Sequence, residues 1–179
     1  NMVALNPSSQ ASVSVVNDGE EETITRYLSD MQPAKATVGW GSLMLDEGLE
    51  NLPLELRTED GGTKVYEKGI CAHAASELVY DIEGRGVQRF QSYIGVNYSK
   101  SRGTCGFTVK ADDEVLFTVD RIAESDPQQY VDVEIPADAK QLILITTTGG
   151  DSNDSDHSVW ADAKLILDAT VQKNLYKVT

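Results

Sequence analysis

The chain has 179 residues, of which 40% are hydrophobic and 25% are charged, and this is the composition of an ordinary globular protein with one domain. Its formal net charge is −14, and no cluster of basic residues interrupts the acidic balance. Nucleic acid and anionic membranes are therefore excluded as expected partners, because both are bound through concentrated positive charge. No apolar run approaches the roughly 18 residues that cross a bilayer.

The residue types that most enzymes need are scarce. The chain has only two cysteines and two histidines, too few for a disulfide scaffold or a three-histidine metal centre. The motifs of serine hydrolases, zinc proteases and nucleotide-binding proteins are absent. Carboxylates are plentiful, but without a barrel or deep-cleft pattern around any pair they indicate solubility and not a glycosidase. The sequence predicts a protein that is not an enzyme.

Taken in chain order, the first predicted element is a linker or disordered segment at residues 1–22, with a weak strand at 13–16. Strands are expected at 23–27 and 63–66, and turns near 31–36 and 43–52. From residue 77 onward apolar and polar residues alternate between turn signals, which is typical of half-buried strands. The predicted strands of this region are 77–82, 89–96, 106–110, 114–119, 130–135, 141–147 and 159–167.

This pattern predicts an all-β protein, an antiparallel β-sandwich or barrel, over residues 23–168, followed by a C-terminal extension or linker at 169–179. If every neighbouring pair is antiparallel, the short turns at 83–86, 112–113 and 136–139 share one end of the sandwich. The longer segments 69–76, 98–104, 121–128 and 148–158 then share the other end. Long polar loops gathered at one end of a rigid sandwich are the expected place for binding.

Two residues, of which His73 falls at the long-loop end, are candidate ligand contacts. His73 can both donate to and accept from a sugar hydroxyl, although it could instead bond to backbone and only hold its loop. Trp40 lies between two glycines, which permits either an exposed indole that stacks on a sugar or a buried plug. His157 is expected to orient the adjacent strand, and Trp160 to be buried.

Further polar groups and the cysteines leave alternatives open. The acidic loop at 151–156 resembles a calcium loop only superficially, and a solvated loop explains it equally. Asp162 stands between apolar neighbours on a predicted strand, so a calcium ion or backbone donors must satisfy it. Cys71 and Cys105 fall at the same predicted end, where either a disulfide or two buried free thiols would be ordinary.

A series of motifs in a fixed order resembles a known family. The sequence is similar to the NPCBM domains, also classified as carbohydrate-binding module family 51, over residues 23–167. The motifs are Tyr27-Leu-Ser-Asp30, Ala36-Thr-Val-Gly-Trp-Gly41, Tyr66-Glu-Lys-Gly69, His73-Ala-Ala-Ser-Glu77, Tyr80-Asp81, Arg89-Phe90, Ile94-Gly-Val96 and Asp156-His-Ser-Val-Trp-Ala-Asp-Ala163.

The resemblance implies a jelly-roll β-sandwich of the galactose-binding type, non-catalytic and monomeric, excised from a secreted or cell-surface bacterial glycoside hydrolase. It implies binding to galactose-configured host glycans, including blood-group A and B determinants, with a structural calcium ion. Transferred by motif, Trp40, His73 and His157 fall nearest the site, and Asp30 and Asp162 nearest the calcium. The cysteines depart from the family's pattern.

The loop at residues 98–103 also departs from the family, because it lacks the acidic residues often seen there. Asn97 and Arg102 offer hydrogen-bond donors there instead. The function predicted is a lectin-like module that tethers a covalently linked glycoside hydrolase to galactose-containing glycans. The alternative is a structural or protein-binding sandwich in a large bacterial surface protein, for which the same fold would serve.

Overall fold

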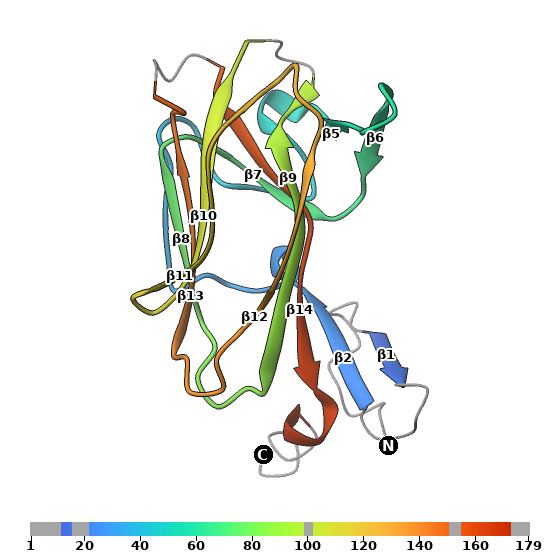
Figure 1. Cartoon of the computed structure of the whole chain (residues 1–179), viewed down its shortest axis with the longest axis vertical. Helices are drawn as coiled ribbons and strands as arrows, with labels where there is room; N and C mark the ends of the chain where they lie inside the picture. The colour runs from blue at the N-terminus through green and yellow to red at the C-terminus, as the bar shows by residue number, and fades with distance from the viewer. Residues whose placement is uncertain (1–11, 16–21, 99–101, 151–154, 173–179) are drawn as a thin grey trace.

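The computed structural model describes residues 12–15, 22–98, 102–150 and 155–172, and these form a β-sandwich (Figure 1). Every strand pairing is antiparallel. The first sheet contains β1 (Ser12–Val15), β2 (Glu22–Tyr27), β14 (His157–Asp168), β7 (Gly69–His73), β4 (Met44–Leu45), β9 (Val87–Val96) and β12 (Gln129–Glu134). The second sheet contains β11 (Glu114–Ala123), β10 (Thr104–Ala111), β13 (Gln141–Thr147), β8 (Ser76–Asp81) and β3 (Lys35–Thr37).

The predicted fold class, an all-β antiparallel sandwich, is confirmed. The long strands β9, β13 and β14 carry the alternation that places one face of each sheet against the core. Trp160 lies at the centre, fully buried as expected, with Phe107 and Phe90 edge-on at centroid distances of 5.2 and 6.1 Å. Burying a side chain of this size contributes roughly 2–3 kcal/mol, so these aromatic contacts are a main source of stability.

Two of the observed strands bear directly on the sequence predictions. The predicted loop at 69–76 is wrong in its first half, because residues 69–73 form β7 between β4 and β14. All five β7 residues are buried, with Ile70 in the main core and Cys71 in a second cluster on the other face of the sheet. A strand covered on both faces has no polar alternation to reveal it. β1 supplies the weak strand expected within the predicted linker.

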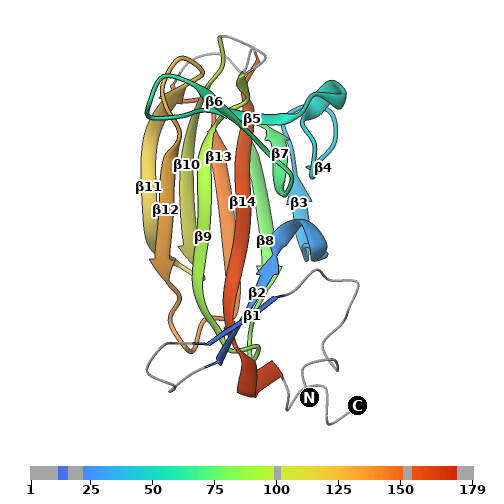
Figure 2. The same ribbon diagram turned by 90° about the vertical axis from the view of Figure 1, so that its right-hand side faces the viewer.

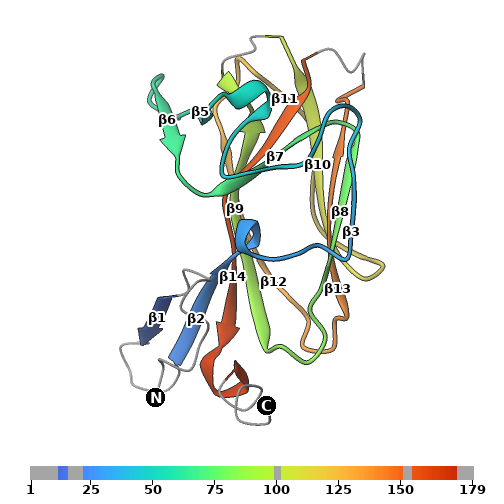
Figure 3. The same ribbon diagram turned by 180° about the vertical axis from the view of Figure 1, so that it is seen from behind.

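A second layer covers the upper half of the first sheet's outer face. It consists of the hairpin β5 (Leu54–Arg57) and β6 (Thr63–Tyr66) with the short helix η4 (Leu49–Asn51), and it stands out from one side of the sandwich (Figures 1 and 3). Leu49, Leu54, Leu56 and Tyr66 pack there against Cys71. Another short helix, η3 (Leu28–Asp30), follows β2. No helix among the described residues is long and apolar enough to cross a membrane.

Hydrogen bonds between loops confirm the predicted grouping at the two ends. At one end, the backbone N–H of Ile82 donates to Lys140 O and that of Asp112 donates to Gln141 O, so the short turns lie together. At the opposite end, the N–H groups of Glu124 and Ala74 donate to Gly103 O and Asp156 O. We call this second end, formed by the described residues around positions 39–48, 73–76, 97–104, 124–128 and 155–157, the loop end.

Both cysteines are free and fully buried, which settles the alternative in favour of thiols. Cys71 lies in the first sheet and Cys105 in the second, on opposite sides of the main core. Burial raises the pKa of the Cys71 thiol to about 12, so the reactive thiolate is absent at neutral pH.

Candidate functional site

Trp40 is the most exposed large side chain at the loop end. Its indole is 55% exposed, so the exposed alternative is the correct one. The two flanking glycines act differently. Gly39 N donates to His73 O, and a Cβ on Gly39 would lie only 2.2 Å from Ala74 O, so only glycine allows this approach. Gly41 has a φ of +71°, which turns the chain away immediately afterwards. The result is an indole held against β7 with much of its surface in solvent.

His73 and His157 lie behind the indole. They are register partners on β7 and β14, with ring centroids 5.4 Å apart, and the Trp40 ring meets His73 edge-on at 6.0 Å. His73 is 7% exposed and His157 is 5% exposed. The prediction that His73 lies on a loop is therefore wrong: it ends a strand, and its ring is mostly covered. The structure brings the three aromatic rings together in one cluster, which we call the Trp-His-His cluster.

The hydrogen bond of His73 defines what its ring can offer. Nδ1 lies 2.8 Å from the carbonyl oxygen of Ala74, and since a carbonyl can only accept, Nδ1 must carry the proton. In the neutral ring, Nε2 is then an acceptor, suited to a hydroxyl donor. One nitrogen of His73 therefore holds the backbone, as the structural alternative predicted, and the role of the other in ligand binding stays a prediction.

The two donors predicted beside the cluster lie in different surroundings. Asn97 is fully buried, its Nδ2 donates to Pro53 O, and its Oδ1 accepts from Glu55 N. Its side chain is therefore used to anchor the chain leading into β5. Its backbone N–H donates to His157 O, so this anchor also supports the cluster. Arg102, by contrast, is exposed just before β10.

The structure adds loop-end residues that the sequence did not single out. Tyr98 is 37% exposed, and the Arg57 guanidinium lies over its ring at 4.8 Å. Arg57 also donates to both the carbonyl and the carboxylate of Glu124. Arg57 lies on the strand β5, which was not predicted from the sequence. No signal in the sequence therefore pointed to its contact with Tyr98. Together they form a second flat, exposed surface at this end.

The acidic loop at 151–156 falls mostly outside the described residues. Its last residue, Asp156, is fully buried, and its Oδ1 accepts from the Thr104 backbone N–H at 2.8 Å. Its carbonyl accepts from Ala74 N. Asp156 therefore joins three loop-end segments and fixes the position of the neighbouring His157.

The two aspartates predicted near calcium are each bonded to a lysine. Asp30 Oδ1 accepts from Lys68 Nζ at 2.8 Å, and Asp162 Oδ2 accepts from Lys164 Nζ at 3.2 Å. The other oxygen of Asp30, Oδ2, is buried with no hydrogen-bond partner among the described residues. No group of three or more His, Cys, Asp or Glu side chains within the described ranges could hold a metal ion. Calcium needs six to eight oxygens, so these two carboxylates do not form a site by themselves.

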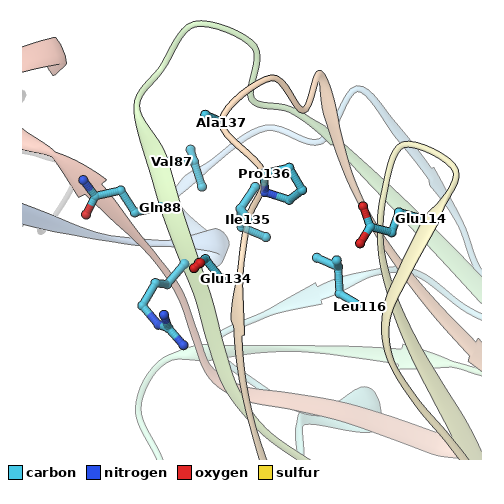
Figure 4. Close-up of a pocket in the computed structure, with 9 residues that line it drawn as sticks. Val87, Gln88, Glu114, Leu116, Glu134, Ile135, Pro136 and Ala137 are labelled. Carbon is cyan, nitrogen blue, oxygen red and sulfur yellow. The ribbon is translucent and has the colours of Figure 1, made fainter.

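A cavity of about 670 Å³ at the short-turn end contains none of the predicted site residues (Figure 4). Val87, Leu116, Ile135 and Pro136 give it an apolar wall, and Glu114 and Glu134 lie at its rim. It therefore differs in character from the loop end, where aromatic rings and histidine nitrogens occur together.

The comparisons with known proteins point to one family. The family model of the NPCBM/NEW2 domain matches residues 24–166. The sequence is 30% identical to the blood-group-substance endo-1,4-beta-galactosidase of Clostridium perfringens over 80% of this chain, which spans 21% of that protein. It is 31% identical to a protein of Renibacterium salmoninarum named as an endo-alpha-N-acetylgalactosaminidase, over 81% of this chain and 10% of that protein.

The similar solved structures are binding modules. The CBM51 module of Clostridium perfringens GH95, in complex with methyl-galactose, has 33% identity and a TM-score of 0.75, covering 79% of this chain and 99% of that one. The CBM51-2 structure of Clostridium perfringens ZmpB, in complex with GlcNAc, has 27% identity and a TM-score of 0.75, covering 89% and 37%. The tandem CBM51 modules of a family 98 glycoside hydrolase from Streptococcus pneumoniae have 28% identity and a TM-score of 0.74, covering 80% and 47%. The chain therefore belongs to the NPCBM/NEW2 domain family, as a carbohydrate-binding module and not a catalytic domain.

Proposed function

We propose that the chain binds terminal galactose-configured sugars at the Trp-His-His cluster. The observation that carries this proposal is an indole that is 55% exposed and held edge-on against a histidine whose Nε2 can accept from a hydroxyl. An exposed indole suits the apolar C–H face of a pyranose, and the imidazole suits the axial hydroxyl that distinguishes galactose from glucose. The similar module solved with methyl-galactose supports the choice of sugar.

The expected affinity is modest. Few polar groups surround the indole, and the desolvation of sugar hydroxyls offsets much of what their hydrogen bonds contribute. A binding free energy of about −4 to −6 kcal/mol corresponds to a Kd between roughly millimolar and tens of micromolar. Several copies on one surface would then increase binding through avidity.

Calorimetric titration with methyl β-galactoside tests the proposal. Trp40→Ala and His73→Phe are expected to lower affinity about tenfold or more, the equivalent of losing about 1–3 kcal/mol of contacts. Val115→Ala is the matched control, because Val115 is 53% exposed on the other sheet. Phe has a ring of similar size to that of His73 but lacks both nitrogens. A parental melting temperature of His73→Phe with weaker binding would therefore indicate lost ligand contacts, whereas a lowered melting temperature would indicate lost folding. Unchanged affinity in both site variants would show that the sugar binds elsewhere.

We also propose that the module holds a covalently linked glycoside hydrolase on secreted or cell-surface host glycans, including blood-group A and B determinants. The relatives named as a galactosidase and a galactosaminidase, in which the matched region is a small part, support this role. A glycan array distinguishes it from the alternative of a structural or protein-binding sandwich. Binding to A and B antigens is expected, whereas binding to glucans alone, or to no glycan, would contradict it.

A further inference from the structure

Three tyrosines form a run that leads from the second hydrophobic cluster to the surface. Tyr66 on β6 lies 5.7 Å from Tyr93 on β9, and Tyr93 lies 4.7 Å from its register partner Tyr130 on β12, measured between ring centroids. Tyr66 is 6% exposed and donates to Gln128 at 2.7 Å, whereas Tyr130 is 50% exposed. The outermost ring is therefore packed on a supported neighbour while half of its surface meets solvent.

The β5–β6 hairpin ends beside this run. Figure 2 shows it crossing the upper part of the first sheet, while β9 and β14 continue below it toward β2 and β1. The open part is the outer face of the sheet, below the hairpin and away from the loop end. Tyr93 and Tyr130 lie at the boundary, where the covered part of the face becomes accessible.

Polar side chains surround the exposed ring on this face. On β14 a bulge, with Asp162 at a φ of 54°, interrupts the register with β9, and Asp162 pairs with Lys164 at 3.2 Å. On the other side Asp132 pairs with Arg89 at 2.8 Å. Gln91 lies between these pairs as the register partner of both Asp132 and Lys164. Such a bulge can re-aim a side chain on its strand.

Most charges on this surface are paired. Asp162 and Asp132 each have a cationic partner there, whereas Glu134, the register partner of Arg89, adds a third carboxylate on the same face of β12. The surface therefore has no excess of positive charge that would attract phosphate groups. Burial, followed by the charge of Asp132, raises the pKa of the Tyr130 hydroxyl, so it remains a neutral donor and acceptor at physiological pH.

We infer that this face is a second carbohydrate-contact surface, centred on Tyr130 and Tyr93 with Gln91 and Lys164, and separate from the Trp-His-His cluster. An exposed aromatic ring beside amide, carboxylate and ammonium groups matches an uncharged, polyhydroxylated ligand: the ring contacts C–H groups while the polar side chains exchange hydrogen bonds with hydroxyls. This surface is separate from the proposed terminal-sugar site, and only its class of ligand, a carbohydrate, rests on the proposed function. The surface would engage internal sugars of long or crowded glycans.

Amide chemical-shift mapping of the labelled chain tests this inference with two probes. Methyl β-galactoside should shift only loop-end amides, whereas a galactose-containing hexasaccharide should also shift those of Gln91, Tyr93 and Tyr130. Tyr130→Ala and Gln91→Ala should each remove the second set and keep the first, and Val115→Ala should keep both. Two independent variants guard against a loss of folding in either one.

Binding to immobilised gastric mucin gives a second readout. Tyr130→Ala is expected to weaken mucin binding about threefold or more and to leave the affinity for methyl β-galactoside unchanged. Trp40→Ala should instead weaken the binding of methyl β-galactoside. Hexasaccharide shifts confined to the loop end, or parental mucin binding by Tyr130→Ala, would overturn the inference. Equal binding to periodate-oxidised mucin would point to a protein partner and overturn it too. Failure of methyl β-galactoside to shift the loop end would instead contradict the proposed function alone.

Discussion

Gly39 determines whether Trp40 can reach its place beside His73. A methyl group at this position would lie 2.2 Å from Ala74 O and 2.8 Å from Ala75 N, both of them backbone atoms that cannot rotate aside. We expect Gly39→Ala to displace the Trp40 segment, lower the melting temperature and weaken galactoside binding at least as strongly as Trp40→Ala. Melting curves and calorimetric titration check both effects.

A matched substitution controls for the general effect of replacing glycine. Gly62 has no positive φ, and a Cβ there meets only the side chains of Asp60 and Thr58, at 3.3 and 3.5 Å. Gly62→Ala should leave both melting and binding close to the parent values. Parental binding by Gly39→Ala would show that the indole does not depend on this close approach.

The sequence predicted the exposure and bonding partners of some single residues better than those of others. Gly-Trp-Gly indicated an indole on a tight turn, and the structure shows it exposed. The alternatives for Trp40 stayed open because exposure depends on β7, with which Gly39 is hydrogen-bonded. Asn97 was expected as a donor to ligand, yet its side chain bonds backbone 42 and 44 positions away. Such distant partners leave no local pattern in the sequence.

Lys68 connects secondary-structure elements that are far apart in the chain through hydrogen bonds and ion pairs. Its ammonium donates to Asp30 in η3 and to Asp46 after β4, both at 2.8 Å, and its carbonyl accepts from Asp162 N on β14. Burial alone would raise the pKa of Asp46, but hydrogen bonds from Lys68, Ser29 and Gly69 outweigh it and hold that pKa below its usual range. For Lys68 burial would lower the pKa, and the bonds to Asp30 and Asp46 raise it instead.

These directions predict a pH window for stability. A lowered carboxyl pKa stabilises the folded state above the usual 3.8, and that stability is lost as pH falls through the folded-state value. A raised lysine pKa stabilises it below the usual 10.5, and that stability is lost as pH rises through the folded-state value. Lys68→Met should cost about 3 kcal/mol of unfolding free energy between these limits, because it leaves partly buried carboxylates without their cation.

Denaturant titrations of parent and variant across pH measure this difference, which should shrink below about pH 4 and above about pH 10.5. Lys35→Met is the control: its ion pair with Glu77 is exposed, with side chains 59% and 37% accessible, and exposed pairs contribute little. A pH-independent difference would mean that Lys68 stabilises through packing of its aliphatic stem.

Most strands with period-two alternation were predictable, whereas β7, which is covered on both faces, was not. The strands from β8 to β14 were each anticipated within a few residues, since one face of each meets solvent or a partly open layer. β5 also alternates, with Leu54 and Leu56 buried, but its four residues are too few for the pattern to stand out. Its hairpin partner β6 was predicted correctly at residues 63–66, yet without β5 the contact of Arg57 with Tyr98 could not be foreseen.

For the molecule as a whole, calcium is the prediction that most depends on family resemblance. Excess chelator is expected to lower the melting temperature of protein prepared with calcium, because an ion that binds only the folded state stabilises it. The ligands would have to include groups besides Asp30 and Asp162, whose carboxylates already bond to lysines. An unchanged melting curve together with elemental analysis that finds no metal would exclude the ion.

β14 also has a mechanical consequence. This strand runs from His157 in the Trp-His-His cluster to Asp168, beside Thr23 at the far end of β2, and it is paired with β2, β7 and β9. Tension between a sugar at the proposed site and the polypeptide leaving Asp168 would therefore act along the strand, across hydrogen bonds that lie perpendicular to the pull. Those bonds share the load in shear and do not open one after another, so under flow the sugar should detach before the sandwich yields.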